Sequence, residues 1–248
     1  LCGGYMDFNY ETEDLGAGIS VCVTPQHKFG TDAFLLSSFS AHRRNDIACD
    51  LGTGCGIIPL LWFKNEPPKE VYAVDIQEKA IEQLKLSVEL NGLGTRLKPV
   101  LGDLKALGGA LPVGTFSLVT CNPPYKVCGT GFLSEGTPEQ IARHEVMCNI
   151  NDVCAAAAQL LKFGGRLCLC QRPERLLDVL EAMRKNAVEP KLVRFVQQRG
   201  DKAPWLFLVR GQKGGKPCLK VEKPLIIEGG GRDGFSDELL KIYGGGKE

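Results

Sequence analysis

Apolar runs of strand length alternate with segments of helical spacing through most of this chain. The short apolar runs, which we expect to be strands, lie at 47–49, 71–74, 97–101, 116–121, 166–170, 192–196 and 205–209. Apolar residues recur at helical spacing between them, which predicts helices over 57–63, 78–91, 153–161 and 176–183. Strands that alternate with helices are typical of a doubly wound, mostly parallel sheet, so we expect an α/β fold.

The two ends of the chain break this alternation. Residues 1–24 are expected to form irregular structure or a small hairpin around 19–23, and Thr31 or Asp32 is the expected N-cap of a following helix. After the core, 211–215 is typical of a hairpin turn, and 219–221 and 225–227 are candidates for short strands. We therefore expect an N-terminal extension with a helix near a cofactor site (1–45), a core (46–210), and a C-terminal hairpin and tail (211–248).

Composition places the chain among soluble globular proteins. Its 248 residues are 44% hydrophobic and 24% charged, which fits one α/β domain with additions. Many of the eleven cysteines lie in apolar runs, and no CxxC pair occurs, so we expect a reduced, cytoplasmic protein without a disulfide scaffold or a metal site. The chain has no apolar run of membrane-spanning length and no signal-peptide pattern, so we expect no membrane association.

Basic residues are concentrated late in the chain, although the formal net charge is only +1. Between 184 and 223, eleven basic residues face three acidic ones, a local balance of +8. The basic residues are Arg184, Lys185, Lys191, Arg194, Arg199, Lys202, Arg210, Lys213, Lys216, Lys220 and Lys223. Such a patch favours a polyanionic partner, and a merely solvated surface is the alternative. The oligomeric state is left open.

A glycine-rich turn, Asp50-Leu51-Gly52-Thr53-Gly54-Cys55-Gly56, follows the first core strand and opens a helix. Glycines allow a sharp turn and a close approach of the backbone to a ligand. The dinucleotide fingerprint requires a small residue where Ile57 stands, and the Asp50 carboxylate would repel a pyrophosphate. A cationic ligand would instead be attracted. S-adenosylmethionine fits, because it carries an ammonium and a sulfonium and no phosphate.

Two further acids end the next two strands. Asp75 stands where an acid can reach a ribose diol, and Asp103 could accept from an adenine amino group while the Leu104 amide donates to the ring. A single acid at such a place is often a helix N-cap, but three in order indicate a ligand crevice.

The sequence Asn122-Pro123-Pro124-Tyr125 directly follows the apolar run at 116–121. Each proline removes a backbone donor, and Pro124 forces Pro123 into an extended conformation. The resulting stiff loop would present an amide, carbonyl groups and an aromatic face, which suits binding of a planar group that bears an –NH2. The alternative is that the prolines only end a strand.

These elements together resemble the class I S-adenosylmethionine-dependent methyltransferases, and residues 122–125 are similar to the NPPY motif of those that methylate amino groups. The chain further resembles the bacterial tRNA1(Val) (adenine-37-N6)-methyltransferase family at 28–33, 142–145, 203–209 and 211–217. The glycines at 229–231 depart from that pattern. The resemblance implies a Rossmann-like, seven-stranded sheet with an antiparallel edge strand, and methyl transfer to N6 of an adenine in a tRNA anticodon loop.

The resemblance also implies roles for individual residues. Asn122 and the Pro123 carbonyl would bind the adenine amino group, and Tyr125 would stack on the extruded base. The expected catalytic set is Asn122, Pro123, Pro124 and Tyr125. The expected cofactor-binding set is Phe29, Thr31, Asp50, Gly52, Thr53, Gly54, Gly56, Asp75, Ile76, Asp103, Leu104 and Asn122. The expected RNA-binding set is Lys126, Arg143, His144, Arg199, Lys202, Lys213, Lys216 and Lys220, with a structural role as the alternative for His144.

Two other substrates stay open at this point. A protein glutamine also presents an –NH2 to such a loop, and a guanine N2 in rRNA is a second possibility. Only about 45 residues precede Asp50, which is short for the extra domains that those enzymes carry, and the basic patch favours RNA.

Overall fold

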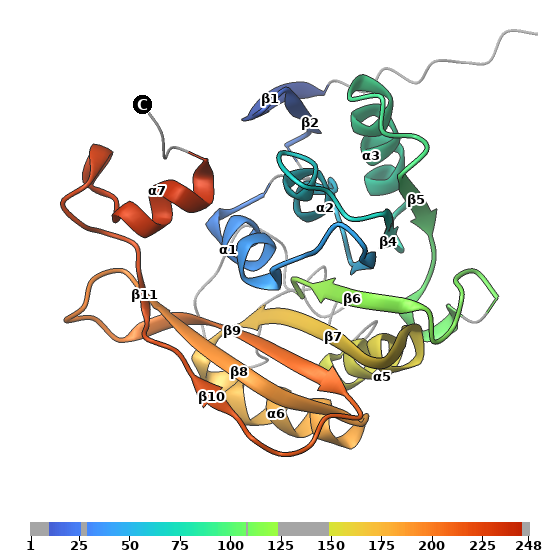
Figure 1. The fold of residues 1–248 in the computed structure, drawn as a ribbon. Helices are drawn as coiled ribbons and strands as arrows, with labels where there is room; N and C mark the ends of the chain where they lie inside the picture. The colour runs from blue at the N-terminus through green and yellow to red at the C-terminus, as the bar shows by residue number, and fades with distance from the viewer. Residues whose placement is uncertain (1–9, 26–28, 108, 124–148, 245–248) are drawn as a thin grey trace, which may run out of the picture.

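A single large sheet organises the computed structural model, which describes residues 10–25, 29–107, 109–123 and 149–244 (Figure 1). The sheet has nine strands in the order β10-β8-β9-β7-β6-β3-β4-β5, and β11 also pairs with β8. Its strands are β3 (Ile47–Leu51), β4 (Glu70–Asp75), β5 (Leu97–Leu101), β6 (Phe116–Cys121), β7 (Leu161–Gln171), β8 (Val188–Gln197), β9 (Pro204–Lys213), β10 (Lys220–Val221) and β11 (Leu225–Ile226).

Strand directions confirm the predicted α/β fold with a mostly parallel sheet. Strands β3 to β7 pair in parallel, whereas β9 runs antiparallel to both β7 and β8. The reversed strand is therefore β9, which lies between β7 and β8. Strands β7 and β8 point in the same direction. The prediction of a C-terminal hairpin within 211–248 is wrong. Strands β10 and β11 each pair in parallel with β8 and not with each other. Residues 211–213, expected to be part of the turn, belong to β9.

Helices cover both faces of the sheet. They are α1 (Thr31–Ser40), α2 (Ile57–Trp62), α3 (Glu78–Leu90), α5 (Ile150–Leu160), α6 (Leu176–Lys185) and α7 (Asp237–Tyr243). The first three and α7 contribute to one buried apolar cluster, and α5 and α6 to the other. Successive strand residues alternate between them, so that Cys168 and Cys170 face α1 while Leu167 and Leu169 face α5 and α6.

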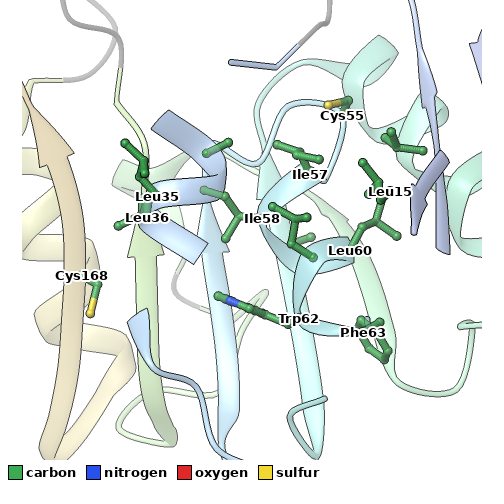
Figure 2. Packing of buried hydrophobic residues seen from close by; sticks show 14 of the residues in the cluster. Leu15, Leu35, Leu36, Cys55, Ile57, Ile58, Leu60, Trp62, Phe63 and Cys168 are labelled. Carbon is green, nitrogen blue, oxygen red and sulfur yellow. The ribbon is translucent and has the colours of Figure 1, made fainter. Parts of the chain in front are cut away.

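The packing between α1 and α2 fixes the start of α1 above the sheet. Figure 2 shows Leu35 and Leu36 of α1 on the side of Ile58 of α2, and Leu60 and Trp62 farther along α2; all of them are buried. Because each buried aliphatic side chain contributes about 1.5–3 kcal/mol, this interface holds α1 firmly.

An antiparallel hairpin of β1 (Glu11–Gly16) and β2 (Ile19–Val23) confirms the turn structure expected near the N-terminus. It docks on α3, where Asn91 accepts from the Ser20 amide at 2.8 Å and donates to the Ser20 carbonyl at 2.6 Å. The Cys22 amide donates to Ser87 Oγ at 2.9 Å. These bonds hold the hairpin against α3.

The start of α1 differs from the sequence-based expectation. Its N-cap is Gly30, and neither Thr31 nor Asp32 occupies that position, because both already belong to the first helical turn. Helix α7 packs nearby: the Tyr243 hydroxyl donates to Thr31 Oγ1 at 3.0 Å. Arg194 of β8 makes two hydrogen bonds with Glu238, which hold α7 in place.

None of the eight cysteines within the described ranges is in a disulfide, and seven of them are buried. Burial raises the pKa of the Cys55, Cys154 and Cys168 thiols to about 12, which leaves them protonated and unreactive. The described helices are each too short or too polar to cross a membrane. In the same parts of the chain, no group of three or more His, Cys, Asp or Glu side chains is arranged so that it could bind a metal ion.

Candidate active site

The candidate site lies at the carboxyl ends of the central strands. Strands β4 and β5 extend to one side of β3, and β6 and β7 extend to the other. The strand order therefore reverses between β3 and β6, and ligands of open α/β sheets bind at such a switch point. Asp50 lies near the end of β3, Asp75 ends β4, and Asn122 directly follows β6.

The glycines of the glycine-rich loop include positions that face open space and one that packs against a helix. Gly52, Gly54 and Gly56 all have positive φ, of 68°, 56° and 80°. A Cβ added at Gly52 or Gly54 would meet nothing within 4 Å, so both face open space. A Cβ at Gly56 would clash with the Leu84 side chain of α3, which gives this glycine a packing role. The loop is tied to β4 because the Thr53 amide donates to the Val74 carbonyl at 2.9 Å.

Asp75 holds this loop in place. One carboxylate oxygen accepts from the Gly54 amide at 2.8 Å, and the other accepts from the Gln77 amide at 2.9 Å. The side chain is buried. A carboxylate has about four acceptor positions, so these two bonds are compatible with further donors from a ligand.

Asp50 is an almost completely buried carboxyl group. The Thr120 hydroxyl donates to it at 2.6 Å, yet burial dominates and raises its pKa to about 7. No arginine or lysine of the described ranges forms an ion pair with Asp50 or Asp75. Two buried acids without a cation favour a positively charged ligand, which would in turn favour the ionised form of Asp50.

Asp103 makes the helix cap that we considered as its alternative role. Its side chain accepts from the Lys105 amide at 2.9 Å and begins the short 3₁₀ helix Leu104–Ala106. It still lies at the carboxyl edge of the sheet, because it follows Gly102, whose amide donates to the Asp75 carbonyl at 3.0 Å. Ile76 is 43% exposed at this edge and offers apolar surface to a planar ring.

The Asn122 side chain is held at both ends. Its Nδ2 donates to Asp32 Oδ2 at 3.1 Å, and Cys170 Sγ donates to its Oδ1 at 3.1 Å. Asp32 comes from the first turn of α1, and Cys170 lies one residue before the end of β7. Neither residue was in the set expected from the sequence. Cys170 could have been found, because it lies near the end of the strand next to Asn122.

Phe29 and Thr31 lie at the start of α1, next to Asp32. The Phe29 ring packs 5.9 Å from the Phe34 ring, and Thr31 is bonded to Tyr243 of α7. The structure thus brings them to the carboxyl edge. Pro123, which follows Asn122, is buried. Of the remaining expected residues, Pro124, Tyr125, Lys126, Arg143 and His144 lie outside the described ranges.

The basic residues do not form one patch around Asn122. Arg199 and Lys202 lie in the loop between β8 and β9, which the strand directions place at the carboxyl edge. Lys213 ends β9 at the opposite edge, where its amine donates to the Leu161 carbonyl at 2.7 Å. Leu208 of β9 is the pairing partner of Cys170, which contacts Asn122. Lys213 lies five residues beyond Leu208, so the two are about 17 Å apart along the strand. Lys216 follows beyond it.

Two further basic residues, Lys220 and Arg172, lie at different distances from Asn122. Lys220 pairs with Leu192 on the outer strand β10, four strands away from β6 and therefore roughly 19 Å across the sheet. Arg172 directly follows β7 at the carboxyl edge, and the sequence analysis missed it. Its guanidinium donates to the Trp205 carbonyl at 3.0 Å and lies 5.6 Å from the centre of the Trp205 ring.

Comparison with known proteins agrees with this geometry. Residues 26–188 match the model of the family described as "methyltransferase small domain". Two similar proteins are named tRNA1(Val) (adenine(37)-N6)-methyltransferase. The one from Tolumonas auensis is 27% identical and the match covers 81% of each chain. The one from Vibrio parahaemolyticus is 26% identical, over 86% of this chain and 85% of the other.

A solved structure from Agrobacterium tumefaciens, titled a predicted O-methyltransferase, resembles this fold. Its TM-score is 0.69 at 24% sequence identity, and the match covers 86% of this chain and 96% of that one. At this identity the likeness concerns the fold alone.

Proposed function

The chain belongs to the methyltransferase small-domain family, and we propose that it transfers a methyl group from S-adenosylmethionine to the N6 amino group of an adenine in tRNA. The observation that carries this proposal is the Asn122 amide, held between Asp32 and Cys170 at the switch point of the sheet. The names of the relatives support the finer assignment, adenine 37 in the anticodon loop of a valine tRNA.

The residues of the crevice fit S-adenosylmethionine. When bound, it supplies a methyl group on a positively charged sulfur, and the products are the methylated amine, S-adenosylhomocysteine and one proton. Asp50 and Asp75 provide the negative potential that a cationic ligand requires. Gly52 and Gly54 leave room for it beside the backbone, and Ile76 would flank its adenine ring. Asp75 would accept from the ribose diol.

The Asn122 loop would prepare the amino group for transfer. An adenine N6 is a poor nucleophile, because its lone pair is delocalised into the ring. Hydrogen bonds from N6 to Asn122 Oδ1 and to the Pro123 carbonyl would favour a more tetrahedral nitrogen with a localised lone pair. The side chains then catalyse by positioning and electrostatics, and no covalent protein intermediate is required.

Basic residues lie at both edges of the sheet, and this distribution supports contacts with an extended RNA. Arg172, Arg199 and Lys202 would bind phosphates near the extruded base. Lys213 and Lys216 would bind a part of the tRNA farther from it. Near these two lysines, Phe163 is 81% exposed and packs against Gly214, so its ring is available to stack on an unpaired base.

The proposal is tested by measuring methyl transfer by the purified protein to three separate classes of substrate. Total tRNA, ribosomal RNA and soluble protein are prepared from a strain that lacks this gene, and each is incubated with S-adenosylmethionine labelled in the methyl group. We expect label in tRNA alone. Label in ribosomal RNA would instead support guanine-N2 methylation, and label in protein would support glutamine methylation.

A further inference from the structure

The two ends of the Asn122 amide have opposite hydrogen-bonding character. Its nitrogen only donates and its oxygen only accepts, so the orientation of the amide decides which substrate group it can bind. An amino group requires the oxygen. An oxo group, such as O6 of hypoxanthine or guanine, requires the nitrogen.

Asp32 provides the contact that selects one orientation. An ionised carboxylate can only accept, and Asp32 Oδ2 lies 3.1 Å from Asn122 Nδ2. On the other side, the Cys170 thiol donates to Asn122 Oδ1 at 3.1 Å. Turning the amide over would bring its oxygen against the Asp32 carboxylate, where neither group can donate, so that hydrogen bond would be lost. The Cys170 thiol discriminates less, because its sulfur can also accept weakly.

We propose that Asp32 is a positioning residue that keeps Asn122 Oδ1 directed at the substrate, and so makes the site select an amino group over an oxo group. This inference rests on the proposed methylation of an adenine amino group. Asp32 acts through Asn122 and needs no contact of its own with the substrate.

Asp32 is itself well placed to set this orientation. Its other oxygen, Oδ1, accepts from the Ala33 amide at 3.0 Å, so both carboxylate oxygens have fixed partners. The far end of α1 is also anchored, because the Arg166 guanidinium donates to the Ser40 and Ala41 carbonyls and pairs with Asp46 at 2.7 Å. The acceptor is therefore organised before the substrate arrives, which reduces the reorganisation needed for catalysis.

A purely structural role for Asp32 makes a different prediction. An acid in the first turn of a helix stabilises the helix N-terminus through the backbone dipole. Loss of that effect would lower stability, but it would weaken amino and oxo substrates equally. The ratio of their affinities therefore separates the two roles.

The test uses Asp32→Asn in the full chain. The new amide can still accept from Ala33 with its oxygen, so its nitrogen faces Asn122 and favours the reversed orientation. Binding is measured for two tRNA transcripts that carry either adenosine or inosine at the target position. We expect kcat on the adenosine RNA to fall at least about tenfold, and the ratio of Kd for inosine RNA to Kd for adenosine RNA to fall at least about fivefold.

A reciprocal exchange provides the rescue. Combining Asp32→Asn with Asn122→Asp restores the hydrogen bond in the reverse direction and again directs an oxygen at the substrate. We expect this double variant to recover part of the kcat and of the preference for adenosine. Asp178→Asn, which alters a first-turn acid of α6, is the matched control and should leave the ratio unchanged.

The outcomes separate this inference from the proposed function. A wild-type protein that methylates no adenosine RNA overturns the proposed function. An active wild type whose affinity ratio is the same in Asp32→Asn overturns the role of Asp32. Misfolding of Asp32→Asn without rescue by the exchange also overturns it, because the role would then be structural.

Discussion

Asp75 accepts a hydrogen bond from the Gly54 amide at 2.8 Å, which links the end of β4 to the glycine-rich loop at the end of β3. A single buried carboxylate thereby shapes the loop, and we propose that it also binds the ribose of the cofactor. The predicted cofactor site is thus coupled to the fold through this hydrogen bond.

Replacing Asp75 should weaken cofactor binding. Asp75→Asn keeps the size of the side chain but loses its charge and an acceptor for Gly54 or the ribose diol. Hydrogen bonds to charged groups contribute about 1.5–3 kcal/mol, so we expect Kd for S-adenosylmethionine to rise about 10- to 100-fold by calorimetry. Glu78→Gln, at the start of the neighbouring helix α3, serves as the control. An unchanged Kd for Asp75→Asn would remove Asp75 from the cofactor site.

Cofactor affinity should depend on pH through Asp50. Burial raises its pKa from 3.8 to about 7, so below pH 7 the carboxyl group is mostly protonated in the cofactor-free protein. A cationic ligand favours the ionised form, and its affinity therefore rises with pH through this range, by about tenfold between pH 6 and 8. Titrations across these pH values should show the rise in the wild type and not in Asp50→Asn. Identical pH profiles would argue against the assignment.

Removing the Asn122 amide should impair transfer and leave cofactor binding intact. Asn122→Ala takes away a group that we expect to act on the amino nitrogen. Loss of one preorganised hydrogen-bonding group typically costs about 10²–10³ in kcat. Single-turnover kinetics measure this loss, and calorimetry measures cofactor affinity in parallel. A variant that loses cofactor binding instead would show that Asn122 is misassigned.

Lysines at the edge opposite the site should affect tRNA binding without affecting chemistry. Replacing Lys213 and Lys216 by Glu should raise KM for tRNA, leave kcat unchanged, and reduce the slope of log Kd against log salt by about one for each phosphate that the variant no longer binds. The control pair is Lys79→Glu with Lys85→Glu, on the exposed surface of α3. An unaltered salt slope in the first pair would exclude this edge from the RNA footprint.

Local sequence signals predicted most of the fold and the cofactor loop. Apolar runs of fixed period, Asn91-Gly92 at the end of α3 and the glycines at 52–56 are short-range features, so each can be identified from neighbouring residues. The acids at strand ends were placed correctly because the carboxyl ends of parallel strands share one edge.

Associations between distant segments could not be predicted in this way. Asp32 and Asn122 are ninety residues apart, and their meeting depends on how α1 packs over β6. The basic residues at 184–223 are close in the sequence, yet β8 and β9 carry them to opposite edges of the sheet. Strand pairing of β10 and β11 with β8 likewise depends on register and not on local turn chemistry.

The most direct test of the central claim is nucleoside analysis of a defined substrate. An unmodified transcript of a valine tRNA with adenine at position 37 is methylated by the purified protein, digested and analysed by mass spectrometry. We predict N6-methyladenosine, and its absence from a transcript with guanine at that position. Formation of N2-methylguanosine, or the absence of any methylated nucleoside, would contradict the account.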